Sequence, residues 1–163
     1  MLVPSEIISV IEGRPVAGTL DQAFVLLTVD AEGVPDVCLL SRAEIESDDR
    51  EVRMVIASRK ARSNLGRSVR GTLIVVVNGV PNYLALLRRA TVEGRGALGV
   101  AVTVTRVIRD DIGVELHPMT FRVDEQLEVV ERWEHSEALF EELRRLADKC
   151  IATPPKAPDR QGC

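Results

Sequence analysis

The sequence ASRKARSNL at residues 57–65 directly follows the apolar run at 52–57 and predicts the first turns of a short helix. Its three cations oppose the helix macrodipole, whose positive end lies at the N-terminus. A sequence that breaks such a local preference often does so at a functional site. Free backbone N–H groups, a serine hydroxyl, an arginine and a lysine together suit a phosphate group. The alternative is a solvated basic helix with Ser58 as an ordinary N-cap, and these residues alone favour neither interpretation.

Apolar and β-branched residues on both sides of this segment form runs that are typical of strands. We expect strands at residues 23–29, 34–45, 52–57, 72–77, 82–92 and 97–108, and two shorter ones at 119–123 and 127–130. The polar residues 30–33 end in glycine and predict a hairpin between the first two strands. Asn78 and Gly79 begin another turn, and residues 93–96 form a third.

Two further helices are predicted near the ends of this β-rich region. Ser5 is a suitable N-cap for the first, which has an apolar stripe and ends near Gly13. The second covers residues 136–150, where leucines repeat at helical spacing, glutamates come early and basic residues come late. With six or seven strands and one short helix between the third and fourth, the sequence predicts a mainly β (α+β) fold, a small antiparallel barrel.

Length and composition fit one globular domain at residues 1–152. The chain has 163 residues, of which 45% are hydrophobic and 28% charged, with a formal net charge of -4. The acidic total argues against a general nucleic-acid binder. No apolar run reaches the ~20 residues of a membrane span. Residues 153–163 contain three prolines and no apolar pattern, so we expect a disordered tail there.

The number and spacing of the cysteines and the N-terminal sequence indicate the cellular compartment. Cys38, Cys150 and Cys163 are odd in number and far apart, which argues against a disulfide framework or a zinc site. The N-terminal residues lack the pattern of a signal peptide. We therefore expect a protein of the reducing cytoplasm.

The order of these elements resembles the FMN-binding split barrel of the pyridoxamine 5'-phosphate oxidase superfamily. The resemblance covers roughly residues 5–108, with a hairpin at Gly33-Val34-Pro35, a strand ending in Ser58-Arg59-Lys60, and the apolar strand at 72–77. In that family a G-x-P hairpin leads into a strand lining the flavin, and an S-R-K-type segment holds the FMN phosphate. The S-R-K-A-R segment is the most specific part of the resemblance. It implies a six- to seven-stranded antiparallel split barrel and strengthens the phosphate interpretation.

The resemblance implies two sets of FMN contacts. Ser58, Arg59 and Lys60 match the phosphate-binding triplet, and Cys38, Leu39, Leu40 and Ser41 match the strand whose backbone lines the isoalloxazine ring. Many members that oxidise phosphate substrates have an arginine and a lysine on this strand, where this chain has Val37 and Ser41. Arg42 could replace a lost cation, although adjacent strand residues point to opposite faces.

The C-terminal region departs from the true oxidases. Their segment with an arginine and a tryptophan, which binds pyridoxal phosphate, has no match in this chain. We therefore do not expect oxidation of pyridoxine or pyridoxamine phosphate.

Other groups of residues predict no specific site. His117 and His135 lack metal-ligand spacing, no nucleophile elbow is present, and Cys38 on a buried strand is expected to be inert.

Two aromatic residues and one pair of arginines remain to be assigned. Tyr83 and Trp133 are expected to pack in a core or an interface. Arg88 and Arg89 are adjacent in a strand, so one is expected to point inward, where it could contact a ligand.

The leading functional hypothesis is an FMN-dependent oxidoreductase acting on an unidentified small organic substrate. Because flavin supplies the redox chemistry, no side chain need act as acid or base. The resemblance also implies a homodimer with the flavin at the interface, without a nucleic-acid or membrane partner. The alternative is a non-catalytic split barrel that binds flavin or haem. A haem iron needs an axial ligand, for which His117 is the candidate donor.

Overall fold

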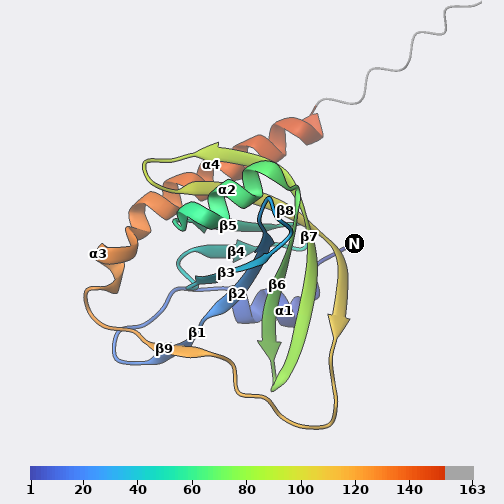
Figure 1. Ribbon diagram of the computed structural model, residues 1–163. Coiled ribbons are helices and arrows are strands. Elements are labelled where there is room, and N and C mark those ends of the chain that lie inside the picture. The colour runs from blue at the N-terminus through green and yellow to red at the C-terminus, as the bar shows by residue number, and fades with distance from the viewer. Residues whose placement is uncertain (153–163) are drawn as a thin grey trace, which may run out of the picture.

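Seven antiparallel strands form the central sheet of the structure, a computed structural model that describes residues 1–152 (Figure 1). The strands are β2 (Phe24–Val29), β3 (Pro35–Leu40), β4 (Ile45–Ser47), β5 (Val52–Ile56), β6 (Arg70–Val77), β7 (Val80–Glu93) and β8 (Leu98–Arg109). Their order is β3-β2-β6-β7-β8-β5-β4, so β3 and β4 are the two edges. This arrangement confirms the predicted antiparallel split barrel.

Helices and a small second sheet surround these strands. The helices are α1 (Ser5–Ile11), α2 (Arg59–Arg67), α3 (Leu127–Glu131) and α4 (Trp133–Ala152), and β1 (Leu20–Gln22) pairs with β9 (Thr120–Arg122). The predicted helices near the N-terminus, after the third long strand and near the C-terminus are confirmed. The tail expected at residues 153–163 lies outside the described residues. None of the helices in residues 1–152 combines the length and apolar character needed to cross a membrane.

Two apolar clusters hold the elements together. Ile7 and Ile11 of α1 are fully buried, and α1 packs against β4 and β6. On the other face of the sheet α4 packs against β5, β7 and β8, and Leu139 and Leu143 form a cluster with Val55. Every residue of β5 is buried as a result. Burial on both faces explains why the sequence of this strand is nearly continuous in apolar residues.

The tight turns follow the residue types that were expected. Asn78 and Gly79, between β6 and β7, have φ angles of 49° and 75°. Positive φ at both central residues is the geometry that joins twisted antiparallel strands in a two-residue hairpin. In the turn between β2 and β3, the Asp30 carboxylate accepts the N–H groups of Glu32 and Val34, and Gly33 has a φ of 84°.

The prediction of a single strand at residues 34–45 is wrong beyond Leu40, where β3 ends. The chain turns at Ser41, whose carbonyl accepts the N–H of Glu44 and whose Oγ accepts the N–H of Ala43. Serine side chains often bond to nearby backbone in this way and offer an alternative to the sheet ladder. Strand pairing resumes only at Ile45, in β4.

The strand predicted at residues 127–130 is also wrong, because these residues form α3. A short apolar run does not by itself distinguish a strand from a helix. Here the Asp124 carboxylate accepts the N–H of Gln126, just before the helix. Arg132, with a φ of 52°, ends α3, so α4 begins at Trp133 and not at residue 136. The short strand predicted at 119–123 is present as β9.

Candidate functional site

The N-terminus of α2 presents the basic segment at the surface. Ser58 is the N-cap, and its Oγ accepts the N–H of Ala61 at 3.3 Å. The N–H groups of Arg59 and Lys60 have no acceptor within the helix, because the first turn of any helix leaves them free. Both of these side chains are exposed. The N-cap role of Ser58 is therefore confirmed, and it leaves N–H groups and cations available to an anion.

Lys60 connects this helix to the edge strand β3. Its Nζ lies 3.2 Å from Oδ1 of Asp36, whose side chain is 15% exposed. The other oxygen of Asp36 is buried without a hydrogen-bond partner. In residues 1–152 Arg59 has no such ion pair, so its charge is more available than that of Lys60. Arg62, one turn further along, has a buried Nε without a partner.

Two buried hydrogen bonds fix α2 against the sheet. The Asn64 side chain is 1% exposed and donates to Oγ1 of Thr28 on β2 at 3.0 Å. Arg88 of β7 donates to the carbonyl of Leu65 near the C-terminal end of α2, whereas Arg89 is exposed. The predicted opposite directions of the two arginines are confirmed. The inward one positions α2, a role that lysine would fill less well because its ammonium lacks the planar fork.

Strand β3 alternates between the core and the surface. Cys38 and Leu40 are 9% and 2% exposed, whereas Val37 and Leu39 are 56% and 50% exposed. One edge of β3 pairs with β2, and the other edge has no neighbouring strand in the described structure. Free N–H and C=O groups along such an edge can bind a further chain or a ligand.

Cys38 does not have the character of a reactive thiol. Burial, reinforced by the charges of Glu44 and Asp36, raises the pKa of this thiol to about 11. Because the thiolate is the nucleophilic form, this environment agrees with the expectation of an inert Cys38.

Ser41 is less available to a ligand than the sequence analysis implied. Its side chain is 3% exposed, and its Oγ donates to Oε2 of Glu131 at 2.8 Å. Its N–H donates to Oε2 of Glu44 at 3.1 Å. Both polar groups are thus held by carboxylates that the sequence analysis did not identify. Glu44 could not be found from sequence, because its neighbour Glu131 is 87 residues away and the two meet only after folding.

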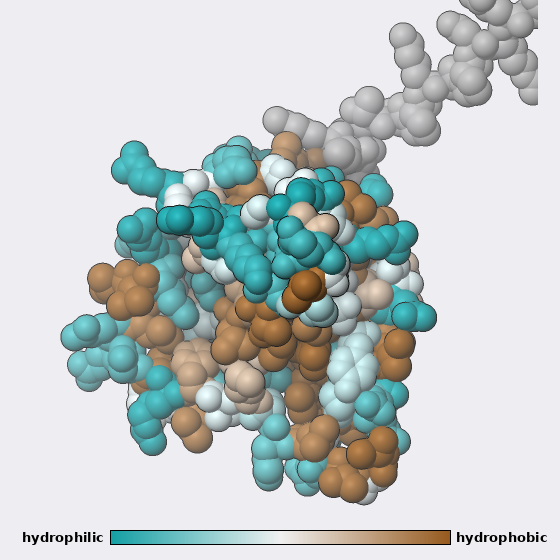
Figure 2. Space-filling view, in the orientation of Figure 1, coloured by the Kyte–Doolittle hydropathy of each residue, from teal (hydrophilic) through white to brown (hydrophobic). Residues whose placement is uncertain are grey.

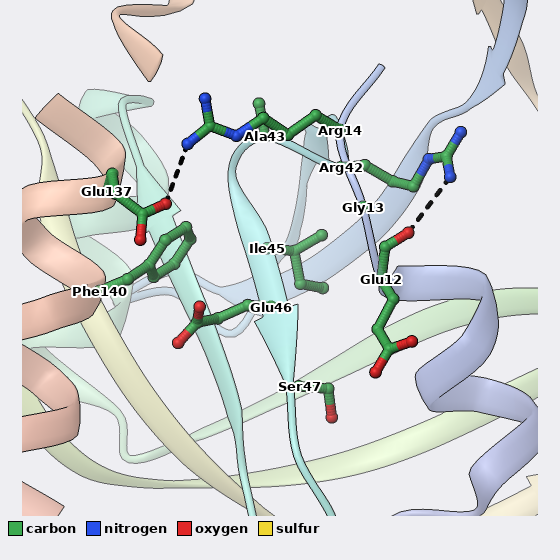
Figure 3. A pocket seen from close by; sticks show the side chains of 10 residues that line it. All are labelled: Glu12, Gly13, Arg14, Arg42, Ala43, Ile45, Glu46, Ser47, Glu137 and Phe140. Carbon is green, nitrogen blue, oxygen red and sulfur yellow. Dashed lines mark hydrogen bonds and ion pairs between the residues drawn. The ribbon is translucent and has the colours of Figure 1, made fainter. Parts of the chain in front are cut away.

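Arg42 does not take the place of a missing cation beside β3. Its guanidinium pairs with Asp21 of β1, with 2.8 Å between Nη2 and Oδ1, and it also donates to the carbonyl of Glu12. It lines a cavity of about 300 Å³ between the end of α1, β4 and α4 (Figure 3). On the other side of this cavity Arg14 pairs with Glu137 at 3.0 Å. Both arginines of this cavity are thus already bonded to neighbouring groups of the protein, as is expected where elements pack together.

A larger cavity, of about 580 Å³, lies beside an ion cluster on β5. Arg53 is 6% exposed, and its guanidinium pairs with Glu46 at 3.0 Å, Asp48 at 2.6 Å and Glu51 at 2.7 Å. Arg144 of α4 also pairs with Glu46. These contacts join the β4–β5 hairpin to α4, so we assign the cluster a structural role.

The histidines and aromatics have structural surroundings. His117 is exposed between β8 and β9, a position that does not support the haem alternative. His135 lies against the β7–β8 turn, where a Cβ on Gly94 would come within 2.8 Å of Nε2 of His135. Trp133 is 9% exposed and donates to Glu131, and Tyr83 donates to Asp110. In residues 1–148 no group of three or more His, Cys, Asp or Glu side chains is placed to hold a metal ion.

Comparison with known proteins identifies the fold. The sequence matches no protein-family model, and no curated protein matches it. Among solved structures, HupZ from Group A Streptococcus matches 71% of this chain and 99% of its own, with 16% identity and a TM-score of 0.52. An F420 reductase matches 65% and 98% of the two chains, with 16% identity and a TM-score of 0.50. The styrene monooxygenase flavin reductase from Pseudomonas putida S12 matches 64% and 88%, with 11% identity and a TM-score of 0.50.

The chain thus shares its split-barrel fold with HupZ, the F420 reductase and the styrene monooxygenase flavin reductase. This agrees with the resemblance to the pyridoxamine 5'-phosphate oxidase superfamily in the sequence analysis. Since unrelated chemistries share folds, the activity has to be argued from the site itself.

Proposed function

We propose that this protein is an FMN-dependent oxidoreductase for a small organic substrate. In this proposal the FMN phosphate lies at the N-terminus of α2, and the isoalloxazine ring lies along the free edge of β3, beside residues 38–41. The contact between Lys60 and Asp36 is the observation that supports it best, because it brings the basic helix end to that edge. Flavin would supply the redox chemistry there.

The residues of α2 fit a phosphate group. The free N–H groups of Arg59 and Lys60 and the positive end of the helix dipole favour an anion. The Arg59 guanidinium can meet two phosphate oxygens at once, and the Lys60 ammonium adds a point charge. The Ser58 hydroxyl oxygen accepts from Ala61, but its O–H is free to donate. Arg62, with a buried unpartnered Nε, is a further cation within one turn.

The first prediction compares FMN with riboflavin. FMN is expected to bind much more tightly, because its phosphate has a charge of about -1.5 to -2 at pH 7 that riboflavin lacks. Fluorescence titrations of both ligands at physiological salt measure the difference. Equal affinity for the two ligands would contradict the phosphate assignment, and tighter binding of F420 than of FMN would replace FMN by a related cofactor.

The second prediction is that the protein forms a homodimer through the outer face of the sheet. On this face Leu27 pairs with Val37 and Val25 with Leu39, and Val37 and Leu39 are half exposed. Figure 2 shows a continuous apolar area where Figure 1 places β2 and β6. Exposed apolar surface of this kind marks an interaction site, and a two-fold contact would cover it together with the β3 edge.

Sedimentation of the wild type and of Val37→Lys tests the dimer. We expect a dimer at micromolar concentration for the wild type and a monomer for Val37→Lys, because a lysine at the centre of a dry interface leaves its charge unpaired. Val16→Lys is the matched control, since Val16 is 60% exposed and lies outside this face. A monomeric wild type with FMN bound would show that the dimer proposal is wrong.

A further inference from the structure

A cavity of about 210 Å³ opens at the end of β3, between β3, β9 and the C-terminal end of α3. Its walls are mostly apolar, with Leu39 and Leu40 on one side and Met119 and Phe121 on the other. Figure 1 shows β9 and α3 on the same side of the molecule. The volume is below that of most drug-sized sites and has room for one ring or a short chain.

Two carboxyl groups, those of Glu44 and Glu131, face this cavity, and both accept a hydrogen bond from Ser41. Oε2 of Glu44 accepts the N–H of Ser41, and Oε2 of Glu131 accepts its hydroxyl hydrogen. Glu131 also accepts from Nε1 of Trp133 at 2.8 Å, which fixes its orientation. These bonds hold both carboxyl groups in place at the polar end of an otherwise apolar cavity.

Neither carboxyl group has a cationic partner in the described structure. Arg42, two residues before Glu44, is already paired with Asp21. Arg132 directly follows Glu131, but it is exposed, does not line the cavity and forms no ion pair with either carboxyl group within the described residues. Burial is the main cause that raises the pKa of Glu44 to about 7, the charge of Glu131 adds to it, and the bond from Ser41 opposes it. Cys38, on β3, adds no charge because its own pKa is about 11. A cavity with two carboxyl groups and no cation repels anions and favours a cation.

We propose that this cavity binds a small primary amine in its protonated form, with the ammonium group between Glu44 and Glu131 and the apolar body against Leu39, Leu40, Met119 and Phe121. That this amine is the substrate rests on the proposed function, since Leu39, Leu40 and Ser41 belong both to this cavity and to the proposed flavin site. The amine-binding site itself does not depend on FMN.

Binding of benzylamine, with benzoate as the anionic probe of similar shape, tests the proposal without flavin. Because the ammonium ion competes with the proton on Glu44, benzylamine should bind more tightly one pH unit above the pKa of Glu44 than one unit below it. Benzoate should not bind at either pH. Calorimetric titration of the full chain, repeated with saturating FMN, measures these affinities.

Two variants distinguish the loss of the amine-binding site from a general loss of folded protein. Glu44→Gln should weaken benzylamine binding by about tenfold or more and remove its pH dependence, since a hydrogen bond between charged partners is lost. Glu32→Gln, at an exposed position in the β2–β3 turn, is the control and should change neither the affinity for benzylamine nor its pH dependence. Thermal melts in parallel check that both variants are folded.

The proposal is overturned if benzoate binds as well as benzylamine, if benzylamine does not bind at millimolar concentration, or if Glu44→Gln retains wild-type affinity and pH dependence. Binding of FMN in a protein that fails to bind benzylamine would reject this inference alone. Binding of benzylamine in a protein that fails to bind FMN would leave the amine site in place and reject the proposed function.

Discussion

Arg59→Ala is expected to weaken FMN binding by about 1.5–3 kcal/mol, the usual contribution of a hydrogen bond to a charged group, or about tenfold or more in Kd. Arg59 is exposed at the N-terminus of α2 and has no ion pair in the described structure, so its guanidinium is free to meet a phosphate. Lys60→Ala should cost less, because Lys60 is a point charge and already pairs with Asp36. Fluorescence titrations with FMN measure both losses.

Paired thermal melts with and without FMN provide the control for this prediction. A ligand that binds only the folded state raises the melting temperature, so the rise should shrink in Arg59→Ala. Without FMN this variant should be no less stable than the wild type, because a cation is removed from the positive end of the helix dipole. Arg67→Ala is the matched variant, since Arg67 bonds to Ser63 and Asn64 of its own helix. Loss of the FMN effect in Arg67→Ala but not in Arg59→Ala would move the phosphate site along α2.

Arg53→Met is expected to lower the free energy of unfolding by about 3–5 kcal/mol at neutral pH, as for other buried ion pairs that lose one partner. Methionine is of similar length but leaves Glu46, Asp48 and Glu51 without the guanidinium that lies within 3.0 Å of each. Urea denaturation measures the difference. The control is Arg50→Met, because Arg50 is 69% exposed and its nearest carboxylate is 4.0 Å away. An exposed pair of this kind contributes at most about 1 kcal/mol.

The decrease in the free energy of unfolding caused by Arg53→Met should be smaller in acid than at neutral pH. Burial alone would raise the pKa of Asp48, but the N–H groups of Arg50 and Glu51 and the guanidinium of Arg53 outweigh it and lower this pKa. A carboxyl group with a lowered pKa stabilises the folded state above its ordinary pKa, and this contribution disappears as the pH falls. The difference between wild type and Arg53→Met should therefore narrow in acid. A difference that is constant from neutral to acid pH would show that lost packing, and not charge, explains the effect.

Much of the fold could be predicted from local sequence. Apolar runs located the long strands, because burial of at least one face requires such residues at regular spacing. Asn78 and Gly79 specified their turn, since few other residue types accept positive φ at both positions. Ser58 specified the start of α2, because its side chain satisfies a free N–H of the first turn. The order of these elements was enough to indicate the split barrel, which solved structures share at only 11–16% identity.

Local sequence was misleading where a residue's role depends on distant parts of the chain. Residues 127–130 have the β-branched composition of a strand but form a helix with Val129 and Val130 exposed, because no strand edge is paired with them. Strand alternation predicted that one of Arg88 and Arg89 points inward, but it did not say which one. The acceptor of Arg88, the carbonyl of Leu65, could not be deduced from sequence either.

The sequence by itself determined most of the long strands, the tight turns and the basic start of α2, because each of these depends on residues close together in the chain. Only the tertiary structure decided that Lys60 meets Asp36, that Arg42 is bonded to Asp21, and that Glu44 faces Glu131 in an apolar cavity. Charge pairing and desolvation act through space over a few ångströms, and the distances between these groups exist only once the chain has folded.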